Sequence, residues 1–314
     1  MVVMNLKEMI TKLHGCTVAD NLPAVVVVVG ATASGKSELA VRLAERFDGE
    51  VVNADSMQVY RGMNIGTARP SAELLQRVPH HLLGIVTPDI NFTAADFLQE
   101  ARRVIGEIHA RGHLPIVVGG TGLYIRALLH GLSPSPGGDE SFRAELTGIA
   151  AREGNAVLLD RLRAVDPETA ARLHVNDRFR IIRALEVYHQ SGRPFSAYQS
   201  GHGFAEEWCT ALKIGIEVPR EELYRRINLR VEQMLANGLI DEVQGLLAAG
   251  YGRGLKALRS IGYKEICSYL AGELSLPAAT ELIKRDTRHY AKRQLTWFKR
   301  EPEINWVEYP EIFS

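Results

Sequence analysis

The residues from Gly30 to Ser37 follow the pattern G-x-x-x-x-G-K-[ST], in which a lysine and a hydroxyl close a glycine-rich loop. In such a loop the backbone N–H groups and the positive end of the following helix converge on an anion, and the lysine adds a charge. The serine is placed to reach a Mg²⁺ ion bridging phosphate oxygens. A structural glycine turn with a surface lysine is the alternative. We therefore predict a diphosphate-binding loop, with Ser37 on the metal side, formed by Gly30, Ala31, Thr32, Ala33, Ser34, Gly35, Lys36 and Ser37.

Two other residues that could take part in catalysis follow predicted strands. Asp55 comes directly after Val51-Val52-Asn53-Ala54, at the strand end where open parallel sheets place their chemistry. Its carboxylate could bind Mg²⁺ through water or accept a proton, or it could cap the turn at Ser56-Met57. Thr121 closes the turn Gly119-Gly120-Thr121-Gly122. Its hydroxyl could contact the transferred group or its diphosphate, or serve as a helix cap.

Arginines at helical spacing provide further anion-binding candidates. Arg226 and Arg230 stand one turn apart and could clamp a diphosphate, although Glu222 could instead pair with Arg226. From Lys284 to Arg300 there are seven Lys or Arg residues against one Asp. This run, like Arg180 with Arg183, could follow a phosphate backbone or form a solvated helix face.

Alternating strand and helix patterns are needed to position these residues. Ala24–Val29 is an unbroken apolar run typical of a strand buried on both faces, and helical patterns cover Lys36 to about Phe47 and Ala94–Arg111. Further strands are predicted at Glu50–Ala54, Leu114–Val118 and Leu212–Val218, and helical stretches at about 220–250, 260–272 and 277–300. The order predicts an α/β protein with a P-loop NTPase-like, doubly wound parallel sheet.

The domain boundaries are predicted from breaks in this rhythm. The cluster Ser133-Pro134-Ser135-Pro136-Gly137-Gly138 and the later Ser191-Gly192-Arg193-Pro194 enclose helical patterns. We expect an N-terminal extension at 1–22, a core with C-terminal helices at 23–137 and 203–314, and a helical insertion domain at 138–202.

The composition is that of an ordinary globular protein. Of the 314 residues, 46% are hydrophobic and 24% charged, and 37 Lys and Arg balance 37 Asp and Glu. The net charge therefore gives no general argument for a polyanionic partner. The three cysteines are scattered, with no zinc-ligand spacing, and no apolar run reaches membrane-spanning length. We expect a cytoplasmic protein that contacts no membrane, and a monomer.

At this point the sequence resembles one family, the bacterial tRNA dimethylallyltransferases, also called isopentenylpyrophosphate transferases. The resemblance starts at Gly30–Ser37 and continues through Asp55–Pro70, in order, over about residues 24–300. Ala31 and Arg69 depart conservatively from the residues usual in the family. The other matching blocks are Pro79–Leu83, Phe92–Phe97, Val118–Tyr124, Arg183–Val187, Ile261–Glu265 and Ala291–Phe298.

The resemblance implies transfer of a dimethylallyl group to N6 of the adenosine on the 3′ side of the anticodon. The loop would hold the diphosphate of dimethylallyl diphosphate with Mg²⁺, Asp55 would act as general base, and Thr121 would line the reaction channel. The partner would be the tRNA anticodon arm, with the adenosine flipped out of its stack. By the same matching, tRNA contacts fall on Asp55, Ser56, Met57, Gln58, Arg143, Phe179, Arg180, Ile181, Ile182, Arg183, Arg259, Ser260, Ile261, Gly262, Tyr263 and Lys264.

Three other functions stay open at this stage. An adenylate isopentenyltransferase would prenylate a free nucleotide and would have little use for a basic insertion. A small-molecule kinase would bind ATP in the loop and transfer a phosphoryl group. A non-catalytic RNA-binding protein would keep its function when Asp55 is replaced.

Overall fold

A computed structural model describes Ile10, Leu13 and residues 22–202 and 208–309. The chain divides into two compact units, His130–Glu206 and the remainder, Met1–Leu129 with Glu207–Ser314. The predicted insertion, 138–202, falls within the first unit, which also includes 130–137 and 203–206 of the predicted core. Most of the predicted N-terminal extension lies outside the described residues, but Ile10 and Leu13 are buried in the core.

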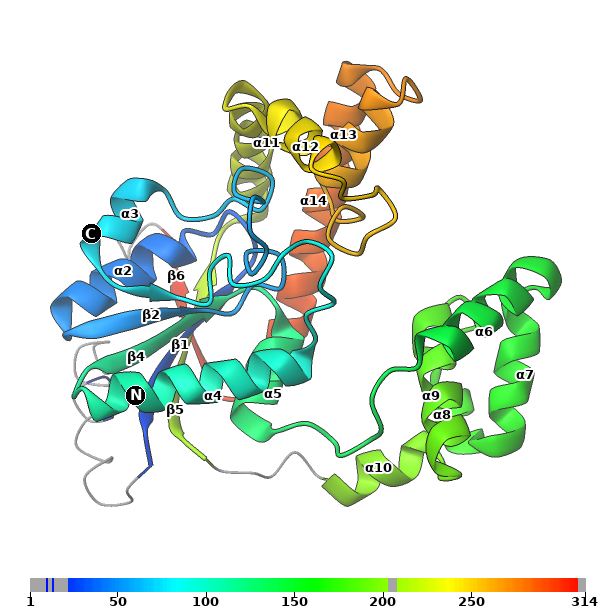
Figure 1. Ribbon diagram of the computed structural model, residues 1–314. Helices are drawn as coiled ribbons and strands as arrows, with labels where there is room; N and C mark the ends of the chain where they lie inside the picture. The colour runs from blue at the N-terminus through cyan, green and yellow to red at the C-terminus, as the bar shows by residue number, and fades with distance from the viewer. Residues whose placement is uncertain (1–9, 11–12, 14–21, 203–207, 310–314) are drawn as a thin grey trace. The chain divides into compact units, whose positions relative to one another are not determined.

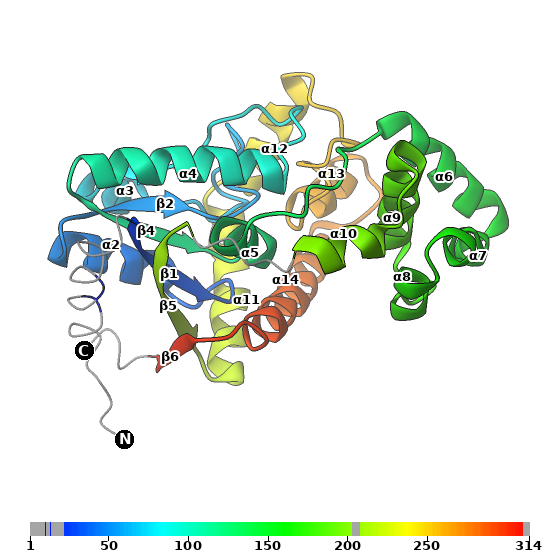
Figure 2. The same ribbon diagram turned by 90° about the horizontal axis from the view of Figure 1, so that it is seen from below.

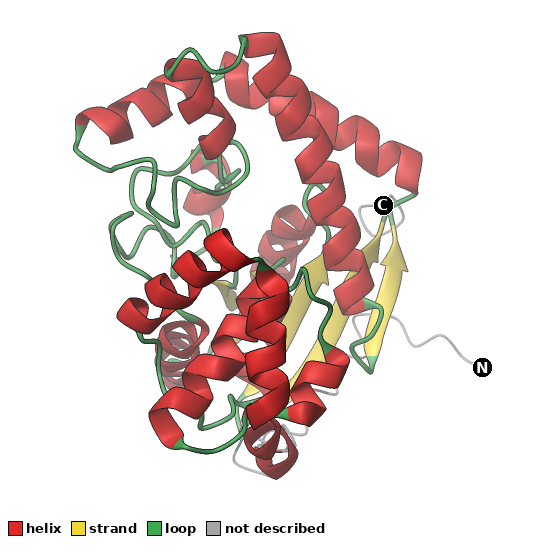
Figure 3. Ribbon diagram, turned by 90° about the vertical axis from the view of Figure 1, so that its right-hand side faces the viewer, coloured by secondary structure: helices red, strands yellow, loops and turns green. Residues whose placement is uncertain are grey.

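The core is built on one parallel sheet. In the described part of the chain it has six strands in the order β3-β2-β4-β1-β5-β6, and every neighbouring pair is parallel (Figures 1 and 3). The prediction of a doubly wound parallel α/β sheet is confirmed. The strands are β1 (Ala24–Gly30), β2 (Gly49–Asn53), β3 (His80–His81), β4 (Leu114–Gly119), β5 (Thr210–Glu217) and β6 (Ile304–Glu308).

Strand β1 is central because both of its faces are apolar. Val25, Val27 and Val29 join one hydrophobic core, whereas Val26 and Val28 join another. The first core packs against α4 (Ala94–Ala110) and α5 (Gly122–His130), and the second against α2 (Lys36–Arg46) and α11 (Arg220–Ala236). Figure 2 shows α4 lying along the sheet. Burial on both faces fixes the strand ends, and therefore the loops that follow them.

Three more helices complete this unit: α12 (Leu239–Ala248), α13 (Tyr263–Leu270) and α14 (Leu276–Phe298). The single helical stretch predicted over about 220–250 is two helices, α11 and α12. The break falls at Gly238, whose φ of 95° lies in the left-handed region that favours glycine. Helix α3 (Ala72–Arg77) and strands β3 and β6 were not predicted. None of the helices of the described residues has both the length and the apolar character needed to cross a membrane.

The other unit is a small helical bundle with its own core (Figure 3). Leu158, Leu162 and Ile181 are fully buried at its centre. Helix α9 ends where Gly192 adopts a φ of 66°, as the predicted break at Ser191–Pro194 requires. The helices are α6 (Glu140–Glu153), α7 (Asn155–Val165), α8 (Pro167–Arg172), α9 (Arg178–Ser191) and α10 (Phe195–His202).

Candidate functional site

The glycine-rich loop connects the carboxyl end of β1 to the first turn of α2. Gly35, the residue before the helix, has a φ of 93°, and Ala33 has a φ of 65°. These left-handed conformations fold the loop back over the start of α2. Because the first N–H groups of a helix have no partner inside the helix, they are free to bind an anion there.

A cavity with a volume of about 60 Å³ opens beside this loop. Thr32, Lys36 and Ser37 line it from the loop and α2, and Arg230 lines it from α11. Asp55 lines it after β2. Other lining residues are Asn53, Gln58, Thr67, Ala68, Pro70, His80, Leu83 and Gly119. The structure therefore brings the predicted phosphate-binding lysine and the predicted base into one cavity.

Within the part of the chain that the structure describes, the two cations of the cavity have no carboxylate bound to them. Lys36 donates from Nζ to the Ala31 carbonyl at 3.2 Å, and Arg230 lies 3.5 Å from Thr32 Oγ1. Among the described residues, neither forms an ion pair. Burial lowers the pKa of Lys36 to about 8, against the opposing effect of the Asp55 carboxylate, and Arg230 lowers it further. Burial also lowers the pKa of Arg230, as does Arg226. Such a pair of partly desolvated charges is stabilised by an incoming anion.

Arg226 supports the loop from outside the cavity. It donates to the Ala33 carbonyl at 3.1 Å, lies 3.5 Å from a Glu222 carboxylate oxygen and stacks on the Tyr309 ring at 4.1 Å. The pairing with Glu222, left open by the sequence, is therefore present. The diphosphate clamp predicted for Arg226 stays a prediction, and Arg230 is the arginine that lines the cavity.

Asp55 and Thr121 lie on two adjacent loops that touch. One Asp55 oxygen, Oδ1, accepts the Met57 N–H at 2.9 Å, which is the turn-capping role left open by the sequence. The other oxygen has no hydrogen-bond partner among the described residues. Thr121 Oγ1 accepts the Ser56 N–H at 3.0 Å and lies 3.3 Å from Ser56 Oγ. One carboxylate oxygen is therefore free to face a ligand.

A loop at Asn64–Ala68 forms another wall of the cavity through Thr67 and Ala68. Gln58 donates from Nε2 to the carbonyls of Thr67 and Ala68, at 3.1 and 3.2 Å. The Glu242 carboxylate accepts the N–H groups of Asn64, Ile65 and Gly66 at 2.8 to 3.0 Å. Sequence reasoning missed Glu242, because a glutamate in a helix has no local pattern that marks such a contact.

The predicted tRNA-contacting stretch Arg259–Lys264 is only partly exposed. Arg259 and Lys264 are exposed, whereas Tyr263 is fully buried and donates its hydroxyl to Glu242 at 2.6 Å. Lys264 also pairs with Asp286 at 3.2 Å. The stretch therefore reaches from the surface to the carboxylate that holds the cavity wall.

In the helical unit, the predicted tRNA-contacting residues differ in exposure. Phe179 is 76% exposed, whereas Ile181 and Ile182 are buried. Arg180, which is exposed, pairs with Asp177 at 3.0 Å. An aromatic ring left in solvent beside arginines fits a nucleic-acid contact, and this assignment stays a prediction.

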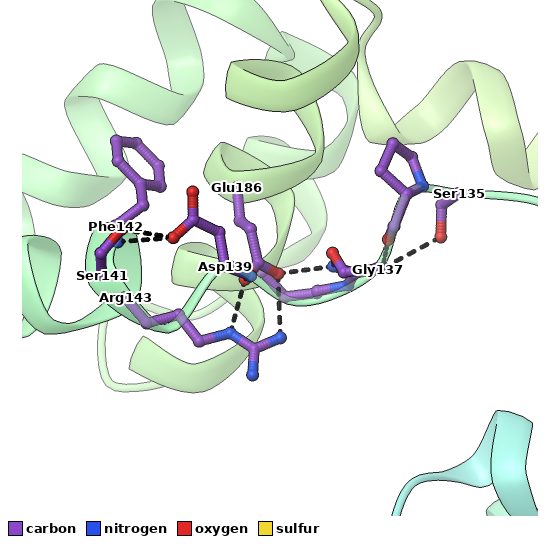
Figure 4. Close-up of polar contacts among 9 residues, drawn as sticks. Ser135, Gly137, Asp139, Ser141, Phe142, Arg143 and Glu186 are labelled. Atoms are coloured by element: carbon purple, nitrogen blue, oxygen red, sulfur yellow. Dashed lines mark hydrogen bonds and ion pairs between the residues drawn. The ribbon is translucent and has the colours of Figure 1, made fainter.

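The fully buried carboxylate of Glu186 pairs with Arg143, as Figure 4 shows, and also with Arg183. Arg143 lies 2.6 Å and Arg183 2.5 Å from its oxygens, and the Asp139 N–H donates to it at 2.6 Å. Arg183 also donates to the Pro136 carbonyl at 2.5 Å. Burial raises the pKa of Glu186, but Arg143, the Asp139 amide and Arg183 outweigh burial and lower it overall. Arg183 and Glu186 thus hold the segment before α6 in place.

The basic run of α14 is also partly engaged. Lys284 lies 2.9 Å from Glu232 and 3.2 Å from Glu281, and Arg288 donates to Asn228 at 2.7 Å. Lys292 and Arg293 are exposed. Arg285, near the start of the run, is exposed as well, but it pairs with Asp286 at 2.8 Å.

Cavity-lining oxygens could hold a divalent cation. Ser37 and Asp55 share the cavity with the two cations. Within the described residues there is no group of three His, Cys, Asp or Glu that could hold a metal ion. A Mg²⁺ ion suits this donor set, because it binds through few protein oxygens, keeps waters and takes the rest from substrate phosphates.

Polar residues at strand ends are the other part of the site that sequence reasoning missed. Buried Asn53, the last residue of β2, donates to the Leu82 carbonyl at 3.1 Å. His80 lines the cavity while its Nδ1 lies 2.9 Å from the Val78 carbonyl. Burial lowers the pKa of His80, which favours the neutral ring. A polar residue closing an apolar strand is the signal that could have marked Asn53.

Comparisons with known proteins show which family the sequence matches. The sequence model described as IPP transferase matches residues 58–301, and the one described as isopentenyl transferase matches residues 23–88. A "tRNA dimethylallyltransferase 2" of Geotalea uraniireducens is 68% identical over 92% of this chain and 93% of its own. A "tRNA dimethylallyltransferase" of Geobacter sulfurreducens is 63% identical over 94% of this chain and 95% of its own.

Solved structures are similar as well. The full-length tRNA isopentenylpyrophosphate transferase of Bacillus halodurans aligns with a TM-score of 0.66 and 43% identity, over 91% of this chain and 89% of its own. A eukaryotic dimethylallyltransferase described as acting on tRNA aligns with a TM-score of 0.75 and 29% identity, over 91% of this chain and 74% of its own.

Proposed function

We propose, since the chain belongs to the tRNA dimethylallyltransferase (IPP transferase) family, that it transfers a dimethylallyl group from dimethylallyl diphosphate to N6 of the adenosine 3′ to the anticodon in tRNA. The observation that carries this proposal is the cavity in which Lys36 and Arg230 share the lining with Asp55, neither of them paired with a carboxylate of residues 22–202 or 208–309. Two free cations beside a glycine-rich loop suit a diphosphate. A carboxylate facing the same space suits an amine that must lose a proton.

The leaving group is held by the loop and its cations. The first-turn N–H groups of α2, Lys36 and Arg230 contact the diphosphate, and the negative charge that develops on its bridging oxygen is stabilised by them. Ser37 would hold a Mg²⁺ ion, which would supply further charge neutralisation to the leaving group. The protein thus makes the diphosphate a better leaving group without covalent participation.

The nucleophile is the exocyclic amine of adenine. Its nitrogen forms a bond to the allylic carbon as the bond from that carbon to the diphosphate oxygen breaks, and the electron pair leaves with the diphosphate. The Asp55 carboxylate takes the proton released from N6. Thr121 holds the Ser56 N–H at 3.0 Å and so keeps the Asp55 loop against the loop after β4.

The tRNA is held by surfaces outside the cavity. Candidate contacts are the exposed Phe179 and Arg180 of the helical unit and the exposed Arg259, Lys264, Lys292 and Arg293 of the core. The adenosine leaves its stack to enter the cavity, because the allylic carbon lies inside it. We assign the enzyme to the cytoplasm, where its tRNA substrate is found, and take it to act as a monomer.

One experiment separates the candidate functions. The protein with Mg²⁺ and dimethylallyl diphosphate labelled in the allyl group is offered tRNA, AMP or ATP in parallel. We expect label in tRNA alone. Label in AMP or ATP would instead indicate an adenylate isopentenyltransferase, and phosphoryl transfer from ATP would indicate a kinase. Absence of label from every acceptor would contradict the proposed function.

A further inference from the structure

Gln294 of α14 joins the two loops that the proposed reaction needs. Its side-chain oxygen accepts the Thr32 N–H at 2.8 Å, and its side-chain nitrogen donates to the Gly120 carbonyl at 2.9 Å. Thr32 belongs to the phosphate-binding loop after β1, and Gly120 precedes Thr121 in the loop after β4. Gln294 is 5% exposed, so both hydrogen bonds form away from water. One buried amide therefore satisfies two backbone groups from different loops.

The chemistry of this bridge requires an amide. A glutamate of the same shape would accept from Thr32 but would turn a carboxylate oxygen, which cannot donate, toward the Gly120 carbonyl. Methionine or alanine would leave a buried N–H and a buried carbonyl without partners, which costs about 1–3 kcal/mol per group. The bridge therefore depends on the identity of Gln294 as well as on its size.

Gly120 is matched to Gln294. A Cβ atom built on Gly120 would lie 2.0 Å from Gln294 Nε2 and 3.2 Å from its Cδ, and the next nearest atom is the Gly30 carbonyl oxygen at 3.7 Å. The glycine is therefore needed because the amide occupies the space where a side chain would begin. A residue with a side chain at 120 would force the two loops apart or displace Gln294.

Tyr290, one turn earlier on α14, links Gln294 to the loop that carries Thr121. Burial and the nearby Asp55 carboxylate raise the pKa of the Tyr290 phenol, while its hydrogen bonds with Thr121 and Gln294 oppose this rise. The phenol therefore keeps its proton. Helix α14 reaches the phosphate-binding loop through Gln294 and the Thr121 loop through both residues.

We infer that Gln294 is a positioning residue that sets the separation between the diphosphate cradle and the Asp55–Thr121 side of the cavity. The inference rests on the proposed function, because it assigns the leaving group to one loop and the nucleophile to the other. Displacing reacting groups by about 1 Å can slow a reaction about a hundredfold without abolishing binding. Loss of the bridge is therefore expected to lower kcat more than it raises KM for dimethylallyl diphosphate.

The test is a double-mutant cycle on Gln294→Ala and Gly120→Ala, measured as kcat and KM for label transfer to tRNA. Each single change is expected to lower kcat about tenfold to a hundredfold, with a smaller change in KM. The double variant should be no slower than Gln294→Ala, because the added methyl group then meets an empty space. Gln294→Glu should be impaired like the alanine variant, and Gln233→Ala, an exposed residue of α11, should be unaffected.

Multiplicative losses in the double variant, or a kcat for Gln294→Ala equal to that of the unchanged protein, would overturn the inference. If Gln294→Ala does not fold, as judged by near-UV circular dichroism, the isosteric Gln294→Glu variant and Gly120→Ala carry the test. Unchanged kcat in both would also overturn it. Failure of the unchanged protein to label tRNA would count against the proposed function, so the two failures are distinct.

Discussion

Two pairs of cations in this chain have opposite surroundings. In the helical unit, the fully buried carboxylate of Glu186 pairs with both Arg143 and Arg183. In the core, Lys36 and Arg230 line a cavity without any ion-pair partner among the described residues. Charge that the protein itself neutralises holds the fold together, whereas charge left without a partner in a cavity indicates a ligand of opposite sign.

The largest effect is expected at the carboxylate that shares the cavity with the free cations. Asp55→Asn keeps the shape of the side chain but removes the proton acceptor, and we expect kcat to fall about 10²- to 10⁴-fold. Binding of dimethylallyl diphosphate, measured by calorimetry, should change little. Asp89→Asn, at an exposed aspartate, is the matched control. A normal kcat in Asp55→Asn would show that Asp55 is not the general base.

Arg230→Met removes one of the two free cations. Loss of a charge that stabilises the leaving group is expected to lower kcat/KM about 10²- to 10³-fold. Arg225, on the same helix, is 65% exposed and pairs with Glu222 at 2.8 Å, so Arg225→Met is the control and should cost little. Equal losses in the two variants would show that pairing does not distinguish ligand-binding arginines from structural ones.

Glu186→Gln tests the other side of the comparison. Replacing the buried carboxylate leaves two arginines without their countercharge, and we expect a loss of about 2 kcal/mol in the free energy of unfolding, reduced from the value for wholly buried pairs because both guanidiniums are partly exposed. Urea unfolding followed through the helical unit measures it. Glu168→Gln, at a 67% exposed carboxylate, is the control.

We also expect the contribution of the Glu186 carboxylate to stability to depend on pH. Because the pKa of Glu186 is lower in the folded than in the unfolded chain, its contribution to stability is present above the unfolded value and is lost as pH falls through the folded one. The difference in stability between the unchanged protein and Glu186→Gln should therefore shrink on acidification from neutral pH. A stability difference between the two proteins that did not change with pH would contradict the assignment of a charged carboxylate to Glu186.

A smaller effect is expected from the titration of Lys36. Its pKa of about 8 in the free protein means that the ammonium loses its proton as pH rises through that value. Since the diphosphate binds the charged form, affinity should weaken by up to about tenfold per pH unit above pH 8. Lys36→Met should bind weakly with little slope over the same range. If the affinity of the unchanged protein for the diphosphate stayed constant from pH 7.5 to 9.5, Lys36 would not be a ligand-binding residue.

Much of the fold followed from local pattern. The valine run of β1 predicts a strand buried on both faces, and this is observed at Ala24–Gly30. The two-residue strand β3 carries no alternating pattern, and it pairs with β2 through Val51 and Val52. The division between α11 and α12 depends on the left-handed backbone of Gly238. The sequence does not reveal this conformation, because an isolated glycine is also tolerated inside a helix.

The residues of the site also differ in whether they could be predicted from the sequence. The pattern G-x-x-x-x-G-K-[ST] and the strand preceding Asp55 marked Lys36, Ser37 and Asp55, which share the cavity. Partners from distant elements were not predictable: Gln294 meets Thr32 across 262 positions of sequence, and Glu242 meets Asn64 across 178. Likewise, the resemblance predicts tRNA contacts at Arg143 and Arg183, but only the fold shows that a buried glutamate pairs with both.

The most direct test of the account is a crystal structure with Mg²⁺ and dimethylallyl S-thiolodiphosphate, an analogue that reacts slowly. We predict that the diphosphate oxygens lie within hydrogen-bond distance of Lys36 and Arg230 and that the allylic carbon faces Asp55. A diphosphate bound elsewhere, or an Asp55 side chain directed out of the cavity, would contradict the central claim.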